Sequence, residues 1–143
     1  MKRIFTPLLI VGLLFINHSL IAQKSIDKKS LQGSWLGKIS VNTMEIRLIF
    51  NLKLNDKDSL MATMDSPDQG AKNIPLGRVI LRNEQFTIQA PLLLGEYKGS
   101  VINDSTINGT WTQRGAGYEV NLKKLNAVFV INRPQEPNHL SHI

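Results

Sequence analysis

The chain has 143 residues, a length typical of one domain, and it contains no cysteine. Without cysteine it has no disulfide bonds, thiolate metal sites or lipid-modified cysteine anchor. The net charge is +6, and removing Lys2 and Arg3 from the 17 basic residues leaves 15 against 11 acidic residues. These charges are scattered rather than gathered beside aromatic residues, a pattern that argues against nucleic-acid binding.

Residues 1–22 have the layout of a secretory signal peptide. Lys2 and Arg3 precede an apolar run, and a more polar segment leads to Ala22. An uncleaved membrane anchor is the competing interpretation, but the apolar run is shorter than the ~20 residues that a spanning helix needs. The sequence therefore predicts cleavage after Ala22, a secreted or periplasmic location and no stable membrane anchor after cleavage.

Residues 23–31 are polar and charged, which predicts a flexible lead-in to a domain that spans residues 32–131. The first strand is predicted at residues 33–41, where Trp35, Ile39 and Val41 share one face. Asn42 and Thr43 then provide a short hairpin turn.

The clearest strand pattern runs from Met44 to Leu54. Apolar side chains take every second position and polar ones lie between them, with Ile49 as the only exception. Because successive side chains of a strand point to opposite faces, this pattern predicts one apolar and one mostly solvent-facing side. Further strands are predicted at residues 60–64, 78–82, 85–90, 92–101, 106–112, 118–122 and 127–131, with a long irregular loop at residues 65–75.

Short, evenly spaced strands with polar turns predict an all-β protein. The expected architecture is an antiparallel up-and-down, barrel-like meander of eight or nine strands, and the alternative is a two-sheet β-sandwich. The barrel-like form is favoured because closure removes exposed edges, and glycines such as Gly99 and Gly109 supply positions where strands bend. Residues 132–143 are predicted to be a proline-containing linker or tail.

The chain lacks the residues that the common catalytic sites require. Residues 23–138 contain no histidine and no cysteine, so they hold no Ser-His-Asp set, no Cys-His pair and no histidine or thiolate zinc site. Asp65 and Asp68 form the one candidate carboxylate pair, but capping of a structured turn is the favoured interpretation. We therefore expect a non-enzymatic protein with no catalytic residues, metal or cofactor.

Two groups of residues are candidates for ligand or partner binding. The first lies in the long loop and comprises Asp65, Ser66, Asp68, Gln69 and Lys72. The second comprises Trp35, Tyr97 and Trp111, which fall on the inward parity of their strands and either fill the core or line a cavity for an apolar ligand. Gly33-Ser34-Trp35 also has the Gly-x-Trp spelling of lipocalins, and Gly109-Thr110-Trp111 repeats it.

The loop adds a more specific resemblance. The segment Met64-Asp65-Ser66-Pro67-Asp68-Gln69-Gly70-Ala71-Lys72-Asn73-Ile74-Pro75, with Gly33–Gly37 before it and Tyr97–Gly99 and Gly109–Gln113 after it, resembles the N-terminal β-domain of secreted bacterial α/β-hydrolases. Those are two-part proteins of the serine-aminopeptidase or prolyl-oligopeptidase type. The resemblance covers roughly residues 32–137, and Arg133–Pro137 is similar to the linker before the catalytic domain.

The resemblance implies an accessory module beside a hydrolase. The chain departs from the family by ending at Ile143, so the catalytic serine and its partners match no position here. Our first hypothesis is therefore a secreted, non-catalytic module that helps a hydrolase domain bind its substrate or hold its shape. The alternative is a lipocalin-like carrier of small apolar ligands, and a third possibility is docking to a separately encoded hydrolase through residues 65–75.

Overall fold

The computed structural model describes residues 25–126, and the segments predicted to be signal peptide and linker lie outside that range. The described chain is all-β, with short 3-10 turns at Lys28–Leu31 (η1), Pro67–Gln69 (η2) and Pro91–Leu93 (η3). Its ten strands are β1 Gly33–Val41, β2 Met44–Leu54, β3 Leu60–Ser66, β4 Ala71–Pro75, β5 Val79–Arg82, β6 Gln85–Ala90, β7 Gly95–Asn103, β8 Thr106–Gln113, β9 Ala116–Glu119 and β10 Leu122–Lys124.

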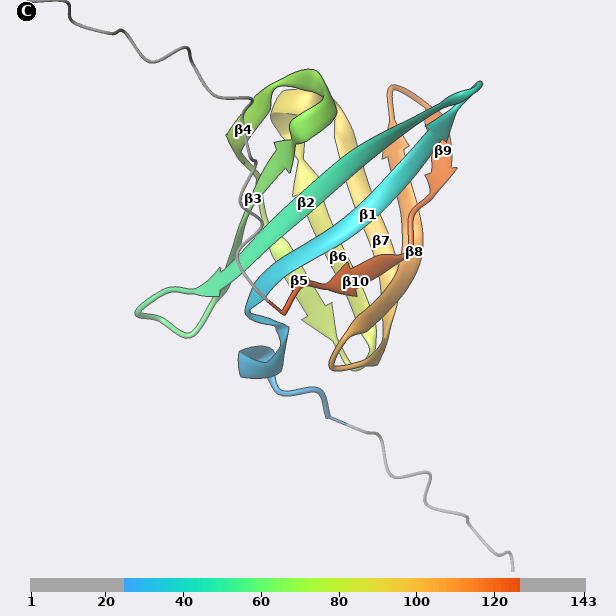
Figure 1. Cartoon of the computed structure of the whole chain (residues 1–143). Helices are drawn as coiled ribbons and strands as arrows, with labels where there is room; N and C mark the ends of the chain where they lie inside the picture. The colour runs from blue at the N-terminus through green and yellow to red at the C-terminus, as the bar shows by residue number, and fades with distance from the viewer. Residues whose placement is uncertain (1–24, 127–143) are drawn as a thin grey trace, which may run out of the picture.

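All ten strands belong to one antiparallel sheet that curls into a half-barrel (Figure 1). The order is β4-β3-β2-β1-β10-β8-β7-β6-β5, and β9 pairs with β8 beside this path. The predicted meander is therefore confirmed, and a single sheet takes the place of the alternative two-sheet sandwich. The predicted strand at residues 127–131 lies outside the described residues.

The two outer strands of the sheet meet at a corner between β4 and β5. The Leu76 N–H donates to the Ala62 carbonyl of β3, while the N–H of the next residue, Gly77, donates to the Gln89 carbonyl of β6. One short segment thus passes from one end of the sheet to the other. This corner therefore links the two ends of the curled sheet.

Two-residue turns fix the register of the main hairpins. Val41 pairs with Met44 across Asn42-Thr43, and Gln113 pairs with Ala116 across Arg114-Gly115. Asn42, Arg114 and Gly115 all have positive φ, at 55°, 49° and 83°. Positive φ in a two-residue turn matches the right-handed twist of the flanking strands, so both turns favour antiparallel pairing of the strands they join.

The structure adds two features to the predicted strand list. Residues 71–75, expected in an irregular loop, form β4 against β3, although Lys72 and Asn73 are both exposed and give no alternating pattern. The predicted strand at 118–122 is divided into β9 and β10, which are separated by Val120 and Asn121. Before these two residues the chain pairs with β8 alone, and after them it pairs with both β8 and β1.

The core confirms the inward parity of the aromatic residues. The Phe50 ring lies 5.6 Å from the Tyr97 ring and 5.9 Å from the Trp111 ring, measured between centroids. Trp35 and Phe86 are also fully buried. Because β2 and β7 contribute Phe50 and Tyr97, these contacts join opposite sides of the curled sheet around one core.

Each buried ring that carries a polar atom has a partner for it. The Trp35 indole N–H donates to the Leu31 carbonyl at 2.8 Å, and the Tyr97 phenol donates to the Val120 carbonyl at 3.0 Å. Burial raises the pKa of Tyr97, which keeps the phenol protonated as a donor. Leu31 itself is buried, so the core begins within the segment predicted to be a lead-in.

Candidate functional site

Among the predicted loop residues, Ser66 bonds to Gln69, while Asp65 bonds to β4 and β2. The Asp65 carboxylate accepts from the Asn73 backbone N–H at 2.7 Å and from the Asn51 side chain at 3.1 Å. The buried Ser66 hydroxyl lies 2.9 Å from the Gln69 side-chain oxygen, to which it donates. Lys72 is exposed on β4. These contacts define a structured turn, which is the interpretation that the residue types favour.

Asp68 has different hydrogen-bond partners from Asp65 and connects η2 to β2. Its carboxylate accepts from the Arg47 guanidinium at 2.6 Å and from the Arg47 backbone N–H at 2.7 Å. The side-chain bond from Arg47, followed by the backbone bond, lowers the pKa of Asp68 to about 2. The two aspartates therefore serve different neighbours instead of forming one acid–base pair.

The lowered pKa gives a prediction for Asp68→Asn. The ordinary pKa of an aspartate is about 3.9, so the stabilisation by the Asp68 carboxylate is complete above pH ~4 and is lost as the pH falls to about 2. Thermal melts should show the variant less stable than the wild type at pH 7, with the difference closing between pH 4 and pH 2. The effect should be modest because both side chains are partly exposed. An equal difference at every pH would contradict this account.

Of the three predicted aromatic residues, Trp111 lines a cavity of the described structure. Trp35 and Tyr97 are packed inside the core. Trp111 is equally buried and also borders a pocket of about 120 Å³ at one end of the half-barrel. Most of the side chains that line this pocket are apolar, and we call it the apolar mouth. Its lining residues are Ile39, Val41, Ile46, Leu48, Met64, Gln69, Ile74, Leu93, Trp111, Gln113 and Tyr118.

The loop around η3 places leucines in solvent next to the apolar mouth. Leu93 lines the pocket, while its neighbours Leu92 and Leu94 are 71% and 67% exposed. Leu94 also has a left-handed backbone, with φ 49°, and its carbonyl accepts from the Arg114 N–H at 3.0 Å. A positive φ is uncommon for residues other than glycine, and at Leu94 it occurs together with an exposed apolar side chain. These two leucines give the molecule an apolar protrusion beside an apolar pocket.

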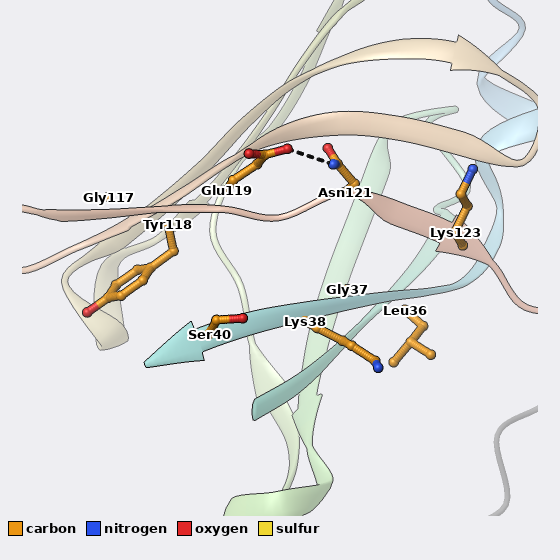
Figure 2. A pocket seen from close by; sticks show the side chains of 9 residues that line it. All are labelled: Leu36, Gly37, Lys38, Ser40, Gly117, Tyr118, Glu119, Asn121 and Lys123. Atoms are coloured by element: carbon orange, nitrogen blue, oxygen red, sulfur yellow. Dashed lines mark hydrogen bonds between the residues drawn. The ribbon is translucent and has the colours of Figure 1, made fainter. Parts of the chain in front are cut away.

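A second cavity lies between β1 and the β9–β10 segment (Figure 2). We call this cavity of about 620 Å³ the β1–β9 cleft. It is lined by Leu36, Gly37, Lys38, Ser40, Gly117, Tyr118, Glu119, Asn121 and Lys123. It arises because β10 pairs with β1 only at Trp35 and Leu36, and β9 pairs with β8 alone.

Most residues of the two cavities were absent from the sequence prediction, which contained only Gln69 and Trp111 among them. Strand length carries the missing signal, because a nine-residue β1 lies beside a three-residue β10. A short strand beside a long one leaves part of the longer edge without a partner. Sequence spacing gives the strands but not which of them are neighbours.

No group of three or more histidine, cysteine, aspartate or glutamate side chains that could hold a metal ion occurs among the described residues. Within residues 25–126 there is also no helix of the length and apolarity that crossing a bilayer requires. The fold defines an all-β, half-barrel class of protein with an apolar pocket and a lateral cleft. Comparisons with protein-family models, curated proteins and solved structures found no match.

Proposed function

We propose that this protein is a secreted or periplasmic, non-catalytic accessory module that binds an apolar group of its partner at the apolar mouth. The observation that carries the proposal is the juxtaposition of an apolar pocket with the exposed Leu92 and Leu94. A contiguous apolar surface on a small protein marks a binding site more often than an isolated exposed side chain does.

The partner that the proposal favours is a serine hydrolase domain or its substrate, on the strength of the resemblance at residues 64–75. That segment includes Gln69 and Ile74, which both line the apolar mouth. The resembling loop and the pocket therefore belong to one end of the molecule. Binding there brings the loop next to whatever group enters the pocket.

The size of the pocket separates this proposal from the carrier hypothesis. Pockets that enclose a drug-sized ligand measure roughly 300–1,000 Å³, and an engineered apolar cavity of about 150 Å³ holds benzene. A pocket of about 120 Å³ fits one branched side chain or a short alkyl group. The volume thus favours recognition of an apolar group over transport of a whole fatty molecule.

A series of linear alcohols tests the apolar mouth, with tryptophan fluorescence, to which the pocket residue Trp111 contributes, as the signal. Each added CH₂ is worth about 0.8 kcal/mol, or roughly fourfold in affinity, while it enters the pocket. We expect affinity to rise over the first few carbons and then to level off as the pocket fills. A rise that continues to fatty-acid lengths would support the carrier, and an unchanged spectrum throughout would contradict both functions.

Two isoleucine variants make this test specific to the pocket. Ile74→Phe enlarges a half-buried side chain of the lining and should weaken alcohol binding at least tenfold. Ile102→Phe makes the same change at an exposed β7 position outside the pocket and should leave binding unchanged. The hydrolase part is tested separately, by co-expressing the module with a candidate serine hydrolase domain and asking whether the two co-purify. Leu92→Ser with Leu94→Ser should abolish that complex, and retention of the complex would contradict docking at this end.

A further inference from the structure

The facing strands of the β1–β9 cleft direct backbone groups into it. In a hairpin closed by a two-residue turn, the first pair exchanges both hydrogen bonds and the next residue points its N–H and C=O away from the partner strand. Val41 and Met44 are the first pair of the β1–β2 hairpin. Ser40, and by the same alternation Lys38, therefore present their backbone groups to the cleft.

The β9 edge has the same arrangement. Gln113 and Ala116 are the first pair of the β8–β9 hairpin, so Gly117 and Glu119 present their backbone groups to the cleft. The Val120 N–H donates back to the Gly109 carbonyl of β8 at 2.8 Å, as this alternation requires. Within residues 25–126, interstrand pairing of β1 on this side ends at Leu36↔Lys123. Two antiparallel edges thus border one cavity with their hydrogen-bonding groups exposed to it.

The charged side chains around the cleft are already partnered, in contrast to these backbone groups. The Lys38 ammonium lies 2.9 Å from the Glu45 carboxylate. The Lys123 ammonium donates to the Thr106 hydroxyl at 2.8 Å. The Asn121 amide donates to the Glu119 carboxylate at 2.9 Å, as Figure 2 shows. A small charged ligand would have to compete with these contacts, whereas an extended backbone would not.

The cleft adjoins the apolar mouth at Tyr118. Tyr118 lines both cavities, and its neighbours in the lining of the mouth include Ile39 and Val41 from β1. These three side chains alternate with the edge residues Lys38, Ser40, Gly117 and Glu119 along their strands. A strand lying in the cleft would therefore send every second side chain toward the apolar mouth and the others toward solvent.

We propose that the β1–β9 cleft binds an extended peptide segment of a partner protein, with one apolar side chain of that segment in the apolar mouth. The peptide backbone pairs with Lys38 and Ser40 on one side and with Gly117 and Glu119 on the other. Gly117 and Ser40 are small, which leaves the backbone accessible. The placement of an apolar side chain in the apolar mouth rests on the proposed function, while the backbone pairing is inferred from the strand edges alone.

The probe is a blocked pentapeptide, acetyl-Thr-Thr-Leu-Thr-Thr-amide, titrated into the mature chain and followed by tryptophan fluorescence and calorimetry. A Leu→Ser peptide should bind at least tenfold more weakly, because it cannot fill the apolar mouth. A peptide N-methylated at alternate amides keeps its side chains but loses the backbone donors along one edge, and it should also bind at least tenfold more weakly. Equal binding of the N-methylated peptide would overturn the strand-pairing inference.

Ser40→Pro and Ser40→Ala form the matched pair of protein variants. Proline removes the N–H that points into the cleft and spares the pairing with β2, whereas alanine removes only the hydroxyl. Peptide binding should be at least tenfold weaker in Ser40→Pro than in Ser40→Ala, with thermal melts to verify folding, and equal binding by the two variants would contradict pairing at Ser40. If Ser40→Pro does not fold, the N-methylated peptide decides the question. If the protein binds alcohols but no peptide, this inference is overturned and the proposed function stands. If it binds peptides but no alcohol, the proposed function is contradicted.

Discussion

Replacing Phe50 with aspartate is expected to unfold the protein. Phe50 is fully buried, and its ring contacts both Tyr97 and Trp111, so it lies where the two sides of the half-barrel meet. Phe50→Ala should cost about 3–5 kcal/mol through lost contacts and a residual cavity. Aspartate also buries a charge without a partner, which costs several kcal/mol more. The total cost exceeds the lower end of the ~5–15 kcal/mol by which a typical domain is stable.

Met61→Asp is the matched control. Met61 is 53% exposed on β3, the strand next to Phe50 in the sheet, so the same charge there remains in water. Its effect should stay within about 0.5 kcal/mol, as for most surface substitutions. Circular dichroism and thermal melting of the two variants test the inside–outside assignment directly. A cooperative melt of Phe50→Asp near the wild-type temperature would show that the parity of β2 is wrong.

Gly109→Ala is expected to be the most damaging of the small substitutions. A Cβ atom at Gly109 would overlap the Lys98 carbonyl oxygen and lie 2.7 Å from both the Gly99 Cα and the Tyr97 hydroxyl oxygen. Two of these three neighbours are backbone atoms of β7, which cannot move without separating β7 from β8. We expect a loss of about 3 kcal/mol or more, at the upper end of the range for overpacked sites.

Gly117→Ala provides the comparison within the same hairpin. The Cβ atom added there would meet only the Thr110 side chain, at an ordinary 3.7 Å. Its effect should therefore be near zero or slightly stabilising, because alanine restricts the unfolded chain more than glycine does. Denaturant titrations of both variants measure the difference. Equal stabilities would contradict the close approach of β7 and β8 at Gly109.

The strands and their inward faces were predictable because alternation is local information. The pattern from Met44 to Leu54 orients β2, and Phe50 lies inside as the parity requires. The strand β4 could not be predicted in the same way. Its exposed Lys72 and Asn73 show no alternation, and it forms because β3 offers a partner. Propensity is weak where tertiary pairing decides the structure.

The candidate site was less accessible to sequence analysis than the fold. Gln69 and Trp111 were identified, but the other residues of the apolar mouth look like ordinary core positions in the sequence. The β1–β9 cleft depends on where the pairing of β1 with β10 stops, and residue types do not encode that point. The signal-peptide and linker predictions concern residues outside the described range and stay predictions.

The pairing of β1 with β10 has a consequence for how the chain acquires its structure. Every other strand pairing joins segments close in sequence, whereas Trp35 pairs with Lys124. During synthesis from the N-terminus, successive hairpins from β1 to β8 can form as they leave the ribosome, but β1 must wait for the last described strand. Loop-closure entropy makes this long-range step the slowest one expected, so the joining of the β1–β4 and β5–β10 parts of the sheet should limit the folding rate.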